Sequence, residues 1–261
     1  MNKTISKHRS LFIRAGAATL ALSLATLCLA QQASPPPTTR FAVTVTQVKP
    51  DMLNEYLDLQ KSEVNPALKK AGVASRAVSS TQFGNTYEYV SIVPLESYAQ
   101  FDAPSPVARA LGPEASARLG AKLRKCITSS RTYIATRADD LSIIPSPKDP
   151  PLVASTLRRR IAPGKGQEYR NFIRNEVLPV MKKAKAEGKI AGYSVATRGM
   201  GSNIGDITTT TFYNKFADME GGNIMARMLG AEAAQKVAAK AAGLSTVVES
   251  YVRRRNADLS F

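Results

Sequence analysis

Two long stretches of this chain carry the same residue pattern, and this internal repeat constrains the fold more than any single motif. The pattern is a Glu-Tyr pair, a Glu-Val-x-Pro group and a Lys-Lys-Ala group, which begin at Glu55, Glu63 and Lys69 and again at Glu168, Glu176 and Lys182. Further on, an Arg-x-Leu-Gly group and an Asp-Leu-Ser group begin at Arg109 and Asp140 and again at Arg227 and Asp258. A few inserted loop residues reconcile the two spacings, so the pattern predicts a tandem duplication.

The first thirty residues are typical of a secretory signal peptide. Four basic residues precede an uncharged apolar run over residues 15–29, and Cys28-Leu29-Ala30 forms a small-x-small cleavage site. We therefore predict cleavage after Ala30 and export to the periplasm or the extracellular space. The alternative is an N-terminal anchor that is kept, although the run is shorter than the roughly 20 apolar residues of a comfortable span. No transmembrane segment is expected after cleavage.

Removal of residues 1–30 would also remove most of the metal-binding chemistry. The chain has one histidine and two cysteines, and both His8 and Cys28 lie in the predicted signal peptide. Without them, the sequence excludes a His-ligated haem, a His-containing zinc site, a Ser-His-Asp triad and an intramolecular disulfide. We expect no metal and no cofactor. Cys126 ends an apolar helical pattern and is expected to be a small buried core residue.

The charge balance is strongly basic, with 36 Lys and Arg against 20 Asp and Glu. The positive charge is spread along the chain and no aromatic platform motif accompanies it, so nucleic acid is not an expected partner. An exported basic protein meets anionic lipids, cell-wall polymers or acidic small molecules first. An anionic envelope surface therefore stays open as a partner.

Periodicity and turn residues divide the chain into two units of one design. A Pro-rich leader (31–39) precedes the first repeat (40–144), a Pro-rich linker (145–151) and the second repeat (152–261). In the first repeat, strands are expected over 41–48, 73–82, 86–93 and 128–137, and helices over 51–71 and 106–125. In the second, strands are expected over 152–161, 190–198, 206–213 and 246–255, and helices over 164–186 and 222–242. Both have the β-α-β-β-α-β order of a ferredoxin-like unit.

Two features predict how these units bend and pack. Pro66 and Pro179 lie inside the first helix of each repeat, where proline removes a backbone donor, so both helices should be kinked there. Each unit should place its helices on one face of a four-stranded sheet, and the predicted hairpin over 73–93 is apolar on both faces. We therefore expect the two sheets to pack face to face as an intramolecular α+β barrel, since each large buried apolar side chain is worth about 1.5–3 kcal/mol.

The element order, the Glu-Val-x-Pro helix and the tandem copy together resemble the dimeric α+β barrel superfamily. That group includes antibiotic-biosynthesis-type monooxygenases, EthD-like proteins and NIPSNAP-type proteins. The resemblance implies a ligand cavity between the helices and the sheet or inside the barrel. Several members bind haem through a histidine, which the predicted repeats of this chain do not contain.

The main candidate site lies where the two copies differ. Alignment of the first strands puts Arg158 opposite Val45 and Arg160 opposite Gln47. The last strand, expected to be a neighbour, carries Arg253 and Arg255 on one face beside Tyr251. If these faces meet, four guanidinium groups converge and need an acidic ligand, Glu249 or solvent to balance them. The alternative is a solvated strand end.

Three further groups are weaker candidates. Tyr87 and Tyr89 have no aromatic counterparts in the second copy, and they either line an apolar pocket in the first copy or belong to its core. Glu63 and Glu176 either form a carboxylate pair between the copies or face free amides and water. The pairs Arg137 with Asp140 and Arg255 with Asp258 are expected to be ion pairs at the end of the last strands.

These observations favour an exported α+β barrel that binds a small molecule, acidic on the arginine hypothesis, without metal. One alternative is a cofactor-free enzyme of the monooxygenase or isomerase kind, in which Tyr87, Tyr89 or Glu88 orients an activated aromatic substrate. Another is a basic structural module that binds the envelope.

Overall fold

The computed structural model describes residues 38–261, and the predicted signal peptide lies outside the described residues. The strands are β1 (Thr38–Val48), β2 (Ala77–Phe83), β3 (Glu88–Pro94), β4 (Ile127–Ala138), β5 (Val153–Ile161), β6 (Gly192–Arg198), β7 (Asp206–Tyr213) and β8 (Ser245–Arg255). They form one closed barrel in the order β1-β3-β2-β8-β5-β7-β6-β4, and every pairing is antiparallel. The α+β barrel expected from the sequence is confirmed at this level.

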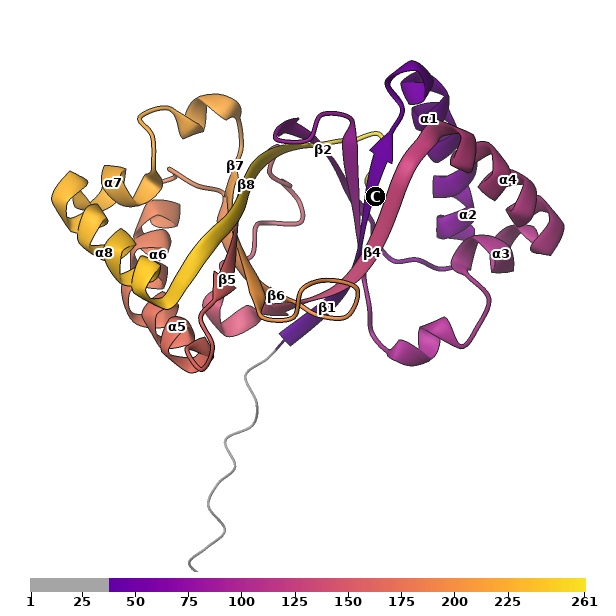
Figure 1. Cartoon of the computed structure of the whole chain (residues 1–261). Helices are drawn as coiled ribbons and strands as arrows, with labels where there is room; N and C mark the ends of the chain where they lie inside the picture. The colour runs from indigo at the N-terminus through magenta and orange to yellow at the C-terminus, as the bar shows by residue number, and fades with distance from the viewer. Residues whose placement is uncertain (1–37) are drawn as a thin grey trace, which may run out of the picture. The chain divides into compact units, whose positions relative to one another are not determined.

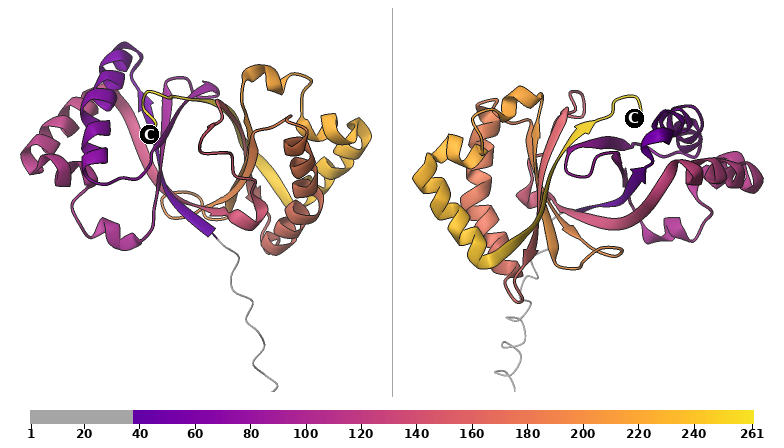
Figure 2. Two further views of the ribbon diagram at one scale, coloured as in Figure 1. Left: turned by 180° about the vertical axis from the view of Figure 1, so that it is seen from behind. Right: turned by 45° about the horizontal axis from the view of Figure 1, so that its top comes forward.

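Helices cover the outside of the barrel on two opposite sides (Figures 1 and 2). Beside β1 to β4, the first half, lie α1 (Leu53–Leu59), α2 (Asn65–Lys70), α3 (Pro106–Leu111) and α4 (Pro113–Cys126). Beside β5 to β8, the second half, lie α5 (Gly166–Phe172), α6 (Leu178–Ala186), α7 (Ile224–Leu229) and α8 (Ala231–Leu244). The described residues contain no helix that is long and apolar enough to span a membrane.

The halves are joined by hydrogen-bonded strands. β2 pairs with β8 and β4 pairs with β6, so each half gives both of its edge strands to the other. An unpaired edge exposes a row of backbone donors and acceptors, and closing the barrel satisfies them. The sequence predicted two sheets packed face to face, whereas the structure joins the halves by pairing their edge strands into one closed barrel.

Each predicted kink is a π-helical turn placed just before the proline. The turns are Gln60–Val64, before Pro66, and Ile173–Val177, before Pro179. In them the amide of Asn65 donates to the carbonyl of Gln60, and the amide of Leu178 to that of Ile173. The wider turn shifts the hydrogen-bond register by one residue, which accommodates a proline that cannot donate.

Three apolar clusters fill the molecule, and their members show which way each strand faces. One lies between the helices and strands of the first half and another between those of the second. The third contains only strand residues, among them Val43, Val90 and Tyr133, so it lies inside the barrel. On β5, Ser155 and Arg159 line a pocket together with helix residues. Because side chains alternate along a strand, Arg158 and its even-numbered neighbours on β5 point into the barrel.

The hairpin of the first half is shorter than expected. β2 begins at Ala77 instead of residue 73, and β3 begins at Glu88. Tyr87 precedes β3 with φ of 60° and is 42% exposed. A tyrosine rarely adopts this left-handed conformation, so Tyr87 belongs to the turn and not to the strand face.

Cys126 is buried at the end of α4, as expected, and its thiol donates to the carbonyl of Lys122. Burial raises the pKa of the Cys126 thiol. The ion pairs predicted at the ends of the last strands were wrong. Arg137 pairs with Asp139, and Asp140 turns instead to Arg170 and Arg174. Asp258 pairs with Lys61, because loops after each strand bring these partners closer.

Candidate functional site

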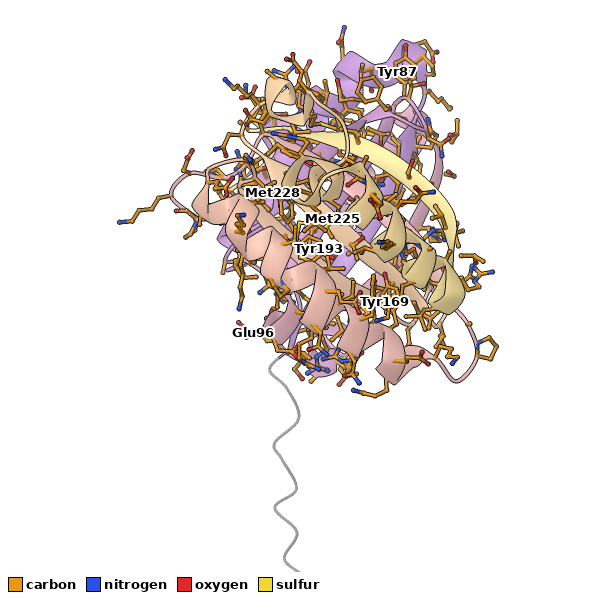
Figure 3. The ribbon with its side chains drawn as sticks, turned by 90° about the vertical axis from the view of Figure 1, so that its left-hand side faces the viewer. Tyr87, Glu96, Tyr169, Tyr193, Met225 and Met228 are labelled. Atoms are coloured by element: carbon orange, nitrogen blue, oxygen red, sulfur yellow. The ribbon has the colours of Figure 1, made fainter. Side chains whose placement is uncertain are left out.

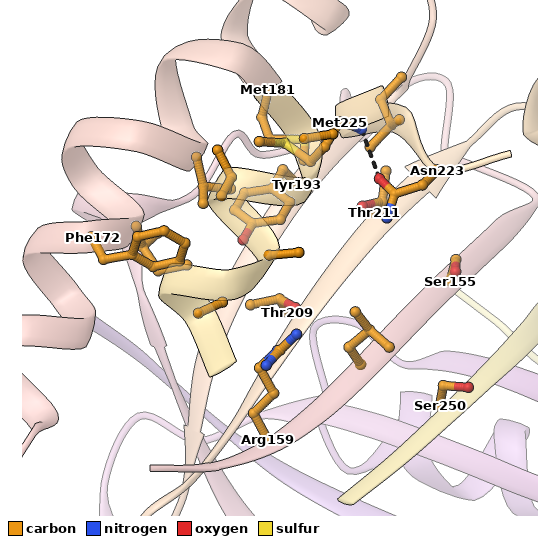
Figure 4. Close-up of a pocket in the computed structure, with 18 of the residues that line it drawn as sticks. Ser155, Arg159, Phe172, Met181, Tyr193, Thr209, Thr211, Asn223, Met225 and Ser250 are labelled. Carbon is orange, nitrogen blue, oxygen red and sulfur yellow. Dashed lines mark hydrogen bonds between the residues drawn. The ribbon is translucent and has the colours of Figure 1, made fainter. Parts of the chain in front are cut away.

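A pocket lies in the second half, between the helices and the outer face of the sheet (Figure 4). Its volume is about 450 Å³, which is within the usual range for small-molecule sites. Residues of β5, β6, β7 and β8 line one wall, and residues of α5, α6, α7 and α8 line the other. The resemblance placed the cavity either here or inside the barrel.

Most side chains on the sheet wall of the pocket carry polar groups, and Leu157 is its apolar member. The wall carries the hydroxyl groups of Ser155, Thr209, Thr211, Tyr193 and Ser250, together with the guanidinium group of Arg159. Arg159 Nη1 donates to Ser245 Oγ at 3.2 Å. None of the residues that line the pocket in the described part of the chain is an aspartate or glutamate. The wall therefore offers hydrogen-bond donors and one positive charge.

The helix wall is apolar and built from adaptable side chains. Phe172, Ile173, Val177, Met181 and Met225 all line it, and Figures 3 and 4 show Tyr193 beneath the methionines. Asn223 caps α7, and its Oδ1 accepts from the amide of Met225 at 2.8 Å. Methionine fills irregular gaps and repacks readily, so this wall suits an apolar ligand body of variable shape.

The phenols of the pocket are proton donors at neutral pH. Burial raises the pKa of Tyr193 far above its usual value, and the neighbouring Tyr169 adds to the rise while Arg159 opposes it. Burial also raises the pKa of Tyr169 and of Tyr213. Protonated phenols next to Arg159 are suited to an anionic or hydrogen-bond-accepting group.

Small residues on α8 explain why the pocket lies in the second half. When Arg109 is aligned with Arg227, Leu119 and Leu123 of α4 correspond to Val237 and Ala241 of α8. Leu119 is fully buried in the first half, whereas its smaller counterpart Val237 lines the pocket of the second half together with Ala241.

The corresponding layer of the first half is also filled by a polar network. Arg76 donates to Ser91 Oγ at 2.8 Å, to Asn65 Oδ1 at 2.6 Å and to Gln60 Oε1 at 2.8 Å. In the repeat alignment Ile173 and Leu178 correspond to Gln60 and Asn65. The two halves therefore have the same order of strands and helices and differ in the side chains between the helices and the sheet.

The arginines predicted from the repeat point into the barrel, where two of them share a buried carboxylate. Asp206 is completely buried and lies 3.2 Å from Arg158 Nη1 and 2.9 Å from Arg160 Nε. Glu249, one of the predicted counter-charges, lies 3.1 Å from Arg158 Nε. The chain thus supplies two negative charges to this pair, and a ligand role for the two arginines stays a prediction.

Arg253 lies at a different point of the barrel. The strand register places it opposite Ala154, whereas Arg158 is opposite Glu249. Arg253 pairs with Glu88 at 2.7 Å and lies over the ring of Tyr251, 3.9 Å from its centroid. Arg255 pairs in register with Ser79 of β2. The four guanidinium groups are therefore divided into two places along β5 and β8.

The two candidate tyrosines of the first half do not share a site. Tyr89 is buried and packs on Tyr56 with ring centroids 5.5 Å apart, whereas Tyr87 lies in the exposed turn described above, near the top in Figure 3. Glu63 pairs with Lys122, and Glu176 pairs with Lys240, each on the outside of its own half. Glu63 and Glu176 therefore form separate ion pairs with lysines and not a carboxylate pair between the copies.

Sequence reasoning missed the pocket residues Arg159, Tyr193 and Thr209. The available signal was the alanine-rich stretch of residues 231–242, which lacks the large side chains of its counterpart. No group of three or more His, Cys, Asp or Glu able to hold a metal occurs between residues 38 and 261. The pocket lining in that part of the chain also includes no histidine or cysteine, so it does not fit a His-ligated or thiolate-ligated haem.

No family model and no curated protein matches this sequence. Among solved structures, it is similar to a protein of Lactobacillus acidophilus NCFM described as a "putative monooxygenase", with a TM-score of 0.56 and 9% identity over 86% of this chain and 96% of that one. It is also similar to an anthrone oxidase-like protein, with a TM-score of 0.55 and 11% identity over 84% and 94%. A third is a mutant chlorite dismutase of Candidatus Nitrospira defluvii, with a TM-score of 0.53 and 10% identity over 84% and 92%. At this identity the likeness establishes the α+β barrel fold and leaves the activity to be argued from the site.

Proposed function

We propose that this protein binds a small organic acid with an apolar body in the pocket of the second half. The observation that supports this proposal is the combination of one apolar wall with an opposite wall that carries Arg159, several hydroxyl groups and no carboxylate. The acid group would pair with Arg159 and accept from the hydroxyls of Thr209 or Tyr193. The apolar body would lie between Phe172 and Met225. Pairing the acid with a guanidinium group offsets the cost of removing its charge from water.

The proposal is tested first by identifying what the protein binds. Native mass spectrometry of the purified chain, followed by denaturation, would reveal a co-purified acid. Calorimetric titration with benzoate, decanoate and their methyl esters would then measure the role of the acid group. We expect the acids to bind at least about tenfold more tightly than the esters, because hydrogen bonds to charged groups contribute about 1.5–3 kcal/mol.

Three variants separate this site from other basic groups. Arg159→Gln should remove the preference for acids, and Ala238→Phe should block the pocket for acids and esters alike. Arg254→Gln removes an exposed charge from β8 and serves as the matched control. Equal binding of acids and esters to the unaltered protein would refute the proposal.

The alternative is a cofactor-free oxygenase that acts on an activated aromatic substrate in the same pocket. The same donors would favour a phenolate or enolate form of such a substrate. The pocket lining described here contributes no carboxylate or histidine as a general base, so the substrate would have to arrive already ionised. Oxygen uptake that depends on an added acidic phenol, and that Arg159→Gln abolishes, would favour this alternative over simple binding.

We also infer that residues 40–144 and 152–261 are two copies of one ferredoxin-like unit. Support comes from the π-helical turn before a proline in each half and from the equivalent pairs Glu63 with Lys122 and Glu176 with Lys240. Recovery of sequences that encode a single unit and assemble as pairs would test this origin.

A further inference from the structure

Arg198 is a buried cation inside the barrel, distinct from the pocket between helices and sheet. It ends β6 in register with Ala135, a member of the cluster inside the barrel, and only 5% of its surface is exposed. Its guanidinium carbon lies 4.7 Å from the centroid of the Tyr133 ring. Its Nη2 donates to the hydroxyl of Tyr251 at 3.2 Å.

The surroundings of Arg198 leave its charge unbalanced. Within residues 38–261 it forms no ion pair, and its buried Nε has no hydrogen-bond partner. Arg158 Nε also lacks a hydrogen-bond partner, but Arg158 and Arg160 share the carboxylate of Asp206, and Arg253 pairs with Glu88. Isolated charges are costly to bury, and proteins almost always pair them.

Arg76 provides a direct comparison, because its exposed fraction is nearly the same, 6%. It too lacks a carboxylate among the described residues, but its Nε, Nη1 and Nη2 each donate to a side-chain oxygen. Arg76 is thus held by its own neighbours. Arg198 makes one such bond and leaves most of its five donors for another group.

A second unsatisfied group lies in the same connection between strands. The Oγ of Ser202, four residues beyond Arg198, is buried and has no hydrogen-bond partner in the described part of the chain. This loop packs closely against β4 at Gly201. A Cβ at that position would lie 2.4 Å from the carbonyl oxygen of Thr132 and 3.0 Å from the Cα of Tyr133. Buried polar groups without partners are rare in folded proteins, and Ser202 directly follows the glycine that contacts this segment of β4.

We propose that Arg198 and Tyr251 form a binding site inside the barrel for the carboxylate of a small organic acid. The planar edge of a guanidinium group matches the two oxygens of a carboxylate. The Tyr251 hydroxyl accepts from Arg198, so its own proton remains free to donate to the acid. A monoanion also balances the single charge of Arg198, whereas a phosphate dianion would leave an excess negative charge in a buried place.

The experiment measures the melting temperature of the full chain, and the binding of acetate by calorimetry. Chloride and inorganic phosphate at equal ionic strength serve as comparison anions. We expect acetate to raise the melting temperature of the unaltered protein more than chloride or phosphate does. Arg198→Met should weaken acetate binding at least about tenfold, as expected for charged hydrogen bonds. Without acetate, this variant should melt at or above the temperature of the unaltered protein, because it removes an unbalanced buried charge.

Two control variants make the result specific. Arg131→Gln removes an exposed guanidinium group that lies 5.9 Å from the same Tyr133 ring, and it should leave acetate binding within about twofold. Ala238→Phe blocks the pocket between helices and sheet and should also leave it unchanged, so this inference can fail or succeed independently of the proposed function. An equal acetate effect in Arg198→Met, or its loss in Ala238→Phe, would overturn the proposal. Destabilisation by Arg198→Met would also overturn it, because Arg198 would then be a structural residue. A larger increase in melting temperature with phosphate than with acetate would do the same.

Discussion

Asp206 is completely buried and accepts hydrogen bonds from both Arg158 and Arg160, through Oδ2 at 3.2 Å and Oδ1 at 2.9 Å. Asp206 begins β7 and Arg160 is its register partner on β5. The pair therefore joins two neighbouring strands at one end of the barrel, where the side chain of Arg158 is only 15% exposed.

Replacement of this carboxylate should be strongly destabilising. Asp206→Asn leaves Arg158 with only the partly exposed Glu249, and breaking a buried ion pair costs about 3–5 kcal/mol. We expect a loss of roughly 3 kcal/mol, because Arg160 is half exposed and can turn to water. Urea unfolding followed by circular dichroism would measure it. Glu249→Gln is the control and should cost less than about 1 kcal/mol, since this side chain is 40% exposed. Equal losses in the two variants would contradict this account.

Arg76 should behave in the opposite way to Arg198, although both are buried arginines. Arg76→Met would leave the side-chain oxygens of Asn65 and Gln60 without their donor in the core of the first half. Each unsatisfied buried group costs about 1–3 kcal/mol, so we expect a loss of about 2–4 kcal/mol. Urea unfolding of Arg76→Met and Arg198→Met side by side would compare them, and a stable Arg76→Met variant would show that this network is dispensable.

Alkaline pH should destabilise the protein through the buried tyrosines. The pKa of Tyr193 is raised by burial, so the folded state keeps a proton that the unfolded chain loses above about pH 10. The stability contributed by this group is complete below that pH and falls as the pH rises further. The expected slope is about 1.4 kcal/mol per pH unit for each such tyrosine.

The Tyr193→Phe variant isolates this contribution. Its free energy of unfolding should fall less steeply between about pH 10 and pH 12, by about the slope of one tyrosine. Urea unfolding at several pH values in this range gives the comparison. Tyr87→Phe changes an exposed side chain, so its unfolding free energy should depend on pH as that of the unaltered protein does. Identical slopes for all three proteins would contradict a raised pKa for Tyr193.

Much of the fold was predictable because local pattern decides it. Alternating residues predicted the strands, and the repeated positions of Pro66 and Pro179 predicted a disturbed helix in each half. The form of that disturbance was not predictable, because a proline can be accommodated by a bend or by a wider turn. In this protein each helix forms a π-helical turn. Tyr56 and Val64 of the first half, and Tyr169 and Val177 of the second, remain in the core.

The candidate site was harder to predict, because contacts distant in sequence decide it. Repeat alignment identified Arg158 from a difference in charge between the copies, and Glu249, one of the groups expected to balance it, is in contact with it. It could not show that Asp206 lies between Arg158 and Arg160, because that depends on the register of β5 with β7. Nor could it show that Arg159, which falls between them, faces a different space.

The amino-acid sequence by itself determined the order of the strands and helices, the absence of histidine chemistry from residues 38–261, and the strong positive charge. These follow from residue type and near neighbours. Tertiary structure decided the rest: closure of the barrel through β2 with β8 and β4 with β6, and the pocket between α8 and the sheet of the second half. It also decided that Arg198 has no carboxylate partner among the described residues. Which buried charges form pairs depends on packing between strands that are distant in the sequence.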